Sequence, residues 1–148
     1  MTNNELFRQV VKAMATGDRD RAIDLNKQVL DSDRRAYFIF VSAVFAGAVE
    51  HRFKDDRSHE AVVRFVNEMR HDFRNAEPPI KPLAVEGLIR ALFGEDHFLD
   101  DIDSEDQFLS QYAVIRKIVD QSDHMKERFD DYLADAETLA RQWASEEG

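Results

Sequence analysis

Apolar residues recur every three or four positions along most of this chain, in blocks of helix length that glycine and proline separate. This spacing is typical of amphipathic α-helices, because residues three and four apart share one face of a helix. The sequence therefore predicts an all-α, single-domain bundle of about seven helices arranged as antiparallel hairpins. We expect the first two helices at residues 3–15 and 18–31, and the third from about residue 33. The fourth follows an N-cap at Ser58, and the fifth covers residues 83–93 after Pro82. The sixth and seventh follow N-caps at Ser104 and Ser122.

The third and fifth predicted helices are apolar around most of their circumference. Such a helix is surrounded by other helices, so we place both at the centre of the bundle. The aromatic and β-branched residues of the third helix also suit a short strand. Ser42, Ala46 and Gly47 favour the helix, because small side chains let another helix backbone come close.

The first two predicted helices form a hairpin that turns at Gly17, just past the end of the first helix. Residues 17–22, together with Val29 and Leu30, resemble the turn and second helix of a tetratricopeptide repeat. The next similar turn follows after 39 residues, whereas that repeat has about 34, so we predict a generic hairpin. Its inward positions are Leu6, Val10, Val11 and Met14 in the first helix and Ala22, Ile23, Asn26, Val29 and Leu30 in the second.

Composition limits the class of protein and its partners. The chain of 148 residues has 43% hydrophobic residues and no cysteine, as expected for one compact domain without disulfides or thiolate metal sites. The longest apolar run, residues 36–49, is shorter than the roughly 20 residues that a membrane span needs. The first residues lack the basic and apolar regions of a signal peptide, so we expect a cytoplasmic protein without membrane association.

Charge is distributed unevenly along the chain. The net charge is −10, which argues against a nucleic-acid partner. Residues 1–94 sum to +1 and form a near-neutral helical core, whereas residues 95–148 sum to −11 and form an acidic helical hairpin of the same domain. The seventh predicted helix buries a continuous stripe from Met125 to Trp143. Its opposite side carries an acidic face available to a basic partner, made of Asp123, Glu127, Asp130 and Glu137.

Three patterns suggest metal chemistry, and each also has an ordinary structural explanation. Glu68 and His71 have the spacing of a di-iron carboxylate motif, and the pair His71 and Asp72 resembles the metal ligands of the HD phosphohydrolases. His71 projects away from the apolar stripe of its helix, so we expect a solvated face instead. The acidic run at residues 96–106 lacks the glycine and glutamate positions of an EF-hand. We therefore expect no metal and no cofactor.

Two hypotheses about function remain. The favoured one is a non-catalytic helical module for protein–protein interaction, which uses its acidic C-terminal surface to hold a basic protein and forms a homodimer through the fifth helix. The alternative is a small helical metal-dependent hydrolase or ligand-binding protein, with a pocket near His51, His59 and His97. No motif in the sequence identifies a reaction or a partner.

Overall fold

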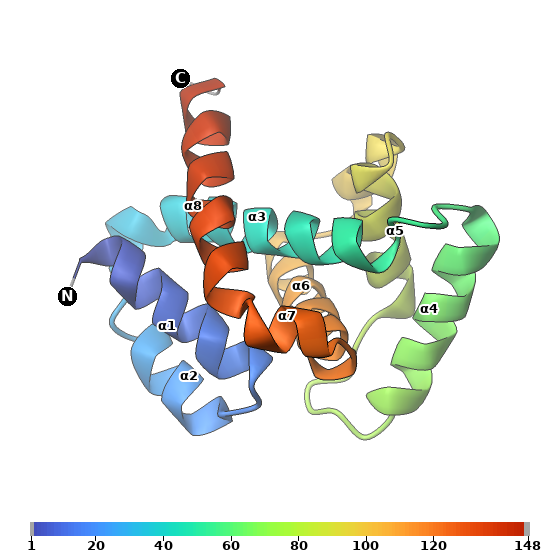
Figure 1. Ribbon diagram of the computed structural model, residues 1–148, viewed down its shortest axis with the longest axis horizontal. Helices are drawn as coiled ribbons and strands as arrows, with labels where there is room; N and C mark the ends of the chain where they lie inside the picture. The colour runs from blue at the N-terminus through green and yellow to red at the C-terminus, as the bar shows by residue number, and fades with distance from the viewer. Residues whose placement is uncertain (1, 147–148) are drawn as a thin grey trace.

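The computed structural model describes residues 2–146, apart from the side chains of residues 97 and 98. Throughout this part of the chain the regular elements are all helical, which confirms the predicted all-α bundle (Figure 1). The α-helices are α1 (Asn3–Ala15), α2 (Arg19–Asn26), α3 (Arg34–Arg52), α4 (His59–Asp72), α5 (Pro82–Leu92), α6 (Ser104–Gln121), α7 (Asp123–Glu127) and α8 (Phe129–Glu146), and the 3₁₀ helices are η1 (Asp31–Asp33) and η2 (Asp96–Asp101).

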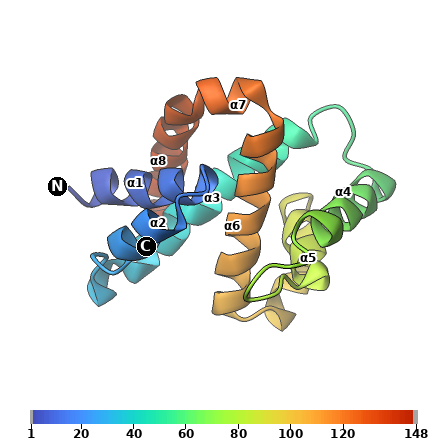
Figure 2. The same ribbon diagram turned by 90° about the horizontal axis from the view of Figure 1, so that it is seen from below.

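Helix α3 occupies the centre of the molecule, where it packs against α1, α6 and α8 (Figures 1 and 2). Its residues Val41, Val44, Ala48 and Val49 are fully buried, as the pattern predicts. Helix α5 is covered by α4, α6 and η2, and it buries Val85, Leu88 and Ile89 in the same hydrophobic cluster. The sequence does not single out α6, which nevertheless shares the centre because it contacts α1, α3, α5 and α7.

Local signals place several helix ends correctly. Ser58 accepts a hydrogen bond from the backbone N–H of Ala61, and Ser122 accepts one from that of Met125, each at 3.2 Å. Both serines therefore cap the first turn of the helix that follows them. Gly17 has a φ of 82° in the turn between α1 and α2, a conformation that favours glycine.

Two helix ends differ from the prediction. Helix α2 ends at Asn26 instead of residue 31, and Ile23 and Leu30 lie exposed instead of inward. The reason is that α2 packs mainly on α1, which covers only one stripe, containing Ala22 and Leu25. The N-cap of α6 is Asp103, one residue before the predicted Ser104, since its carboxylate accepts the N–H of Asp106 at 2.9 Å.

The predicted seventh helix is two helices that meet at Arg128. Helix α7 packs on α6, whereas α8 turns away to pack on α3. The bend lets Met125 of α7 and Phe129, Leu133 and Ala136 of α8 all be buried. Tertiary packing overrides the continuous helical period here, because no glycine or proline marks the bend in the sequence.

Candidate protein-binding site

The break at Arg128 divides the four acidic residues that the sequence groups on one helix. Asp123 and Glu127 lie exposed on α7, whereas Asp130 and Glu137 lie on α8 beside α1. Glu137 accepts two hydrogen bonds from Arg8, which raise the pKa of that guanidinium. Asp130 pairs with Lys12 at 3.0 Å. Two of the four carboxylates are thus paired with cations of α1, whereas the two on α7, Asp123 and Glu127, have no cation partner among the described residues.

The histidines of the alternative hypothesis have separate surroundings. His51 lies at the end of α3, and His59 begins α4, where it contacts Arg90 of α5. The side chain of His97 lies outside the described residues. Within residues whose side chains are described, no three histidines or carboxylates are grouped to hold a metal ion, and His71 is exposed as predicted.

His51 belongs instead to a polar cluster where α3, α7 and α8 meet. Its Nε2 is 3.1 Å from the Ser122 hydroxyl, its Nδ1 is 3.3 Å from the Tyr132 hydroxyl, and its ring stacks on that of His124. Burial, followed by the nearby Lys54 and His124, lowers the pKa of His51. The neutral imidazole of His51 thus connects α3 to α7 and α8.

This lowered pKa predicts a loss of stability in mild acid. The unfolded chain protonates His51 more readily than the folded protein, so the free energy of unfolding should fall as the pH drops below about 6.5. Thermal midpoints measured between pH 7.5 and 5.5 should therefore fall less steeply for His51→Gln than for the wild type. His71→Gln changes an exposed histidine and should keep the wild-type slope. Equal slopes for all three proteins would contradict this role of His51.

A second polar cluster fastens α4 to α6. The Lys117 ammonium lies 2.5 Å from Asp72 and 3.6 Å from Glu68, and its side chain is 2% exposed. The same ammonium lies over the Phe65 ring, 5.7 Å from its centroid. A hollow of about 420 Å³ lies beside this cluster. Because two carboxylates and an aromatic face already surround the ammonium, we interpret the cluster as structural.

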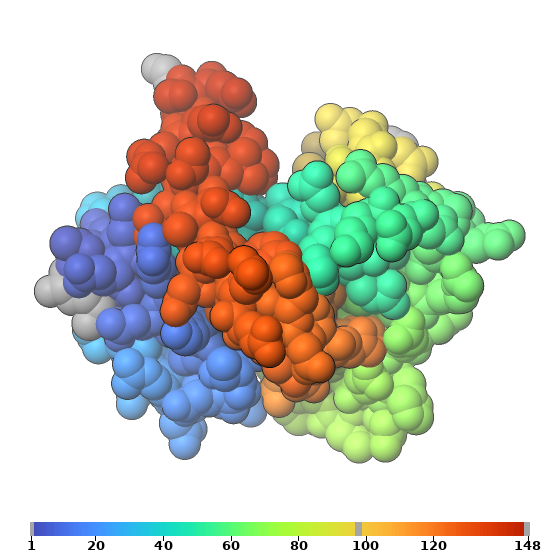
Figure 3. Space-filling view, viewed as in Figure 1, coloured from blue at the N-terminus to red at the C-terminus, as the bar shows by residue number. Residues whose placement is uncertain are grey.

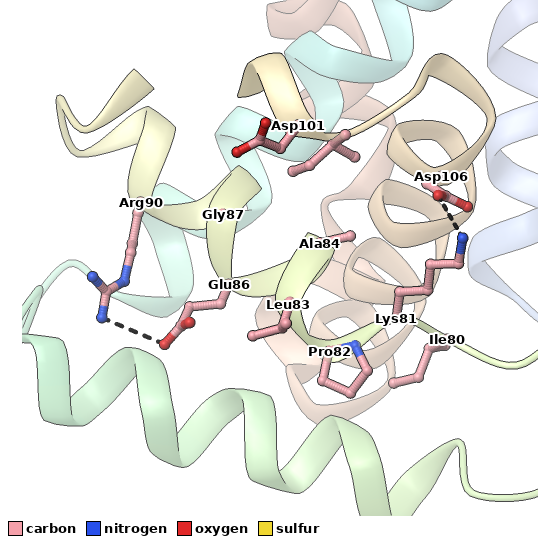
Figure 4. Close-up of a pocket in the computed structure, with 11 residues that line it drawn as sticks. Ile80, Lys81, Pro82, Leu83, Ala84, Glu86, Gly87, Arg90, Asp101 and Asp106 are labelled. Carbon is pink, nitrogen blue, oxygen red and sulfur yellow. Dashed lines mark hydrogen bonds and ion pairs between the residues drawn. The ribbon is translucent and has the colours of Figure 1, made fainter. Parts of the chain in front are cut away.

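An open groove of about 650 Å³ lies between the start of α5 and η2 (Figure 4). Its floor is apolar, and Leu83 at its edge has an exposed fraction of 78%, the highest among the large apolar residues whose side chains are described. Pro82 forms the first turn of α5, since its fixed φ suits a helix start, and this places Leu83 at the rim. The apolar lining consists of Ile80, Pro82, Leu83, Ala84, Gly87 and Ile102.

Carboxylates form one wall of the groove. Asp101 and Asp106 line it, and exposed Asp100, Asp103 and Glu105 follow the same segment of chain. Lys81 lies across the groove and pairs with Asp106 at 2.7 Å (Figure 4).

The electrostatic effect of this acidic wall is visible at Lys81. The hydrogen bond and charge of Asp106, with smaller contributions from Asp103 and Glu105, raise the pKa of its ammonium. A cation at the wall is therefore favoured over a neutral group.

The sequence does not predict this groove. The pattern places Leu83 in a helix that other helices surround, and α5 is covered on three sides, but the side bearing Leu83 is open. The acidic run beside the groove is visible in the sequence, although its position next to α5 is not. Its chain folds as the 3₁₀ helix η2, which packs on α5.

No helix in the described residues is long and apolar enough to cross a membrane. No protein family matches the chain, and no curated protein or solved structure is significantly similar to it.

Proposed function

We propose that this protein is a non-catalytic interaction module that binds a segment of another protein rich in basic and apolar residues, and that the groove between α5 and η2 is its binding site. The observation that carries the proposal is the exposed Leu83 beside a wall of carboxylates. We also propose that the module is cytoplasmic and forms homodimers.

The apolar floor supplies the first part of the binding energy. A large apolar side chain in water is stabilised when a partner covers it, by about 25 cal/mol for each Å² removed from water. Leu83 extends from the rim, and Ile102 and Ala84 continue the apolar surface into the groove. An apolar side chain of the partner that enters the groove would contact all three residues.

The acidic wall favours a partner segment with positive charge. Asp106 already binds Lys81, and Glu86 already pairs with Arg90 at 3.4 Å, so both rims hold pairs that a partner leaves intact. Exposed Asp100, Asp101 and Asp103 add negative charge along one side. Lysine or arginine flanking the apolar anchor of the partner would pair with these carboxylates and accelerate association at low salt.

A selection from a random peptide library displayed on phage tests the proposal. Peptides selected on the wild-type protein should combine leucine, isoleucine, phenylalanine or methionine with lysine or arginine. Leu83→Asp should weaken their binding by about tenfold or more, since an anchor of an interface contributes about 2 kcal/mol. The fold should tolerate this change, because aspartate is favourable in the first turn of a helix.

Leu30→Asp provides the matched control, because Leu30 is also exposed, at 65%, and lies outside the groove. It should bind the selected peptides as tightly as the wild type does. Selection of acidic peptides, or binding that Leu83→Asp leaves unchanged, would contradict the proposal. Affinity measured by fluorescence anisotropy at low and at moderate salt should also fall as salt rises.

A further inference from the structure

The second half of α8 projects beyond the body of the protein (Figures 1 and 3). Helix α8 buries Phe129, Leu133 and Ala136, all in its first half. Beyond them, Trp143 is only partly buried, against the start of α3. Among the described residues, the end of this helix therefore has neighbours on only part of its circumference.

The residues of this projecting end carry little charge for a helix that extends into solvent. Leu139, Ala140 and Trp143 are partly buried, and Ala144 is exposed. Arg141 is the only charged residue between positions 138 and 145, whereas the first half of α8 is markedly acidic. A helix of polar character on most sides is expected where only solvent surrounds it. The composition fits a helix end that another molecule covers.

A notch lies beside the projecting end, between α8 and the η2–α5 region (Figures 1 and 3). Helix α3 forms its floor. Two hollows mark its sides, one of about 270 Å³ next to Trp143 and one of about 240 Å³ next to Leu92. Ser42 and Ala46 line them, and such small side chains let a helix approach closely.

We infer that the notch receives the projecting end of α8 from a second copy of this chain. The inference rests on the homodimer proposed above and assigns its interface to α3 and α8 instead of the predicted α5. A projection and a notch on the same side of a molecule are self-complementary. A twofold axis then places α8 of each copy in the notch of the other, and a closed dimer results.

Electrostatics agrees with this arrangement. The two α8 helices run antiparallel across the axis, so their dipoles attract. Glu137, the first acidic residue before the apolar end, is held by Arg8 of its own chain and contributes little repulsion. Across the notch, Arg57 lines the hollow beside Leu92 and pairs there with Glu50 at 3.8 Å, so this side of the notch adds no net charge against the weakly charged end of α8.

Sedimentation equilibrium tests the inference through one exposed alanine. The wild type should be a dimer at about 100 µM, and Ala144→Arg should be a monomer with an unchanged circular dichroism spectrum, because arginine replaces a methyl group inside the contact. Ala134→Arg makes the same change at an exposed position in the first half of α8 and should remain a dimer. A dimeric Ala144→Arg would overturn the interface, whereas a monomeric wild type would overturn the homodimer itself and leave the peptide-binding proposal standing.

Two further experiments separate this interface from the groove. Leu83→Asp should remain a dimer, and a monomeric Leu83→Asp would assign the interface to α5 and overturn the inference. The chain has no cysteine, so single cysteines can be placed freely. A mixture of Ala144→Cys and Leu92→Cys proteins should cross-link with a short bifunctional maleimide, and a mixture of Ala134→Cys and Leu92→Cys should not. Equal cross-linking of the two mixtures would also overturn the inference.

Discussion

Replacing Val44 by aspartate should unfold the protein. Val44 is 2% exposed and lies on α3, where this helix packs against the rest of the core. An unpaired carboxylate at such a site costs several kcal/mol, which is comparable to the total stability of a domain of this size, about 5–15 kcal/mol. We expect the far-ultraviolet circular dichroism signal of the helices to be lost, or the thermal midpoint to fall by tens of degrees.

Ala36→Asp is the control for this prediction. It introduces the same carboxylate on the same helix, but at an exposed position in the first turn, where a negative charge is favourable. This variant should keep the wild-type thermal midpoint. Leu88→Asp applies the same test to α5, since Leu88 is 3% exposed, and should also unfold the protein. A folded Val44→Asp with a normal midpoint would mean that α3 is not the centre of the core.

The sequence predicts most helices because their signals are local. The serine caps at Ser58 and Ser122 act within one turn, and Pro82 sets the start of α5 through its own backbone angle. The apolar period adds the direction in which each helix faces. None of these signals depends on residues distant in the sequence, so reading them requires no knowledge of the tertiary arrangement.

The candidate sites depend on neighbours that are distant in the sequence. Arg8 and Glu137 are 129 positions apart, so the sequence does not show that α1 neutralises part of the acidic face on α8. The exposure of Leu83 follows from the absence of a covering helix on one side of α5, which the apolar pattern of α5 itself contradicts. The sequence shows where charged and apolar residues lie along the chain, but tertiary packing decides which of their side chains are exposed.

Lys117 shows the same dependence on distant neighbours within the core. The apolar period of α6 places a lysine among buried residues, where its ammonium requires partners. Asp72 and Glu68 provide them, one turn apart on α4. Lys117→Glu would place a third carboxylate beside these two and bury it. We expect a loss of about 3–5 kcal/mol in the free energy of unfolding, measured by urea denaturation.

Two variants distinguish this buried arrangement from a general effect of charge. Arg116→Glu makes the same change in charge at the adjacent, exposed position of α6, and it should cost less than about 1 kcal/mol. Lys117→Met keeps the length of the side chain without its charge, and since Asp72 and Glu68 are each more than 40% exposed, water can solvate them instead. Its stability should lie within about 1–2 kcal/mol of the wild type. If Arg116→Glu and Lys117→Glu were equally unstable, the net charge of the acidic half, and not the buried contact between α4 and α6, would determine the loss.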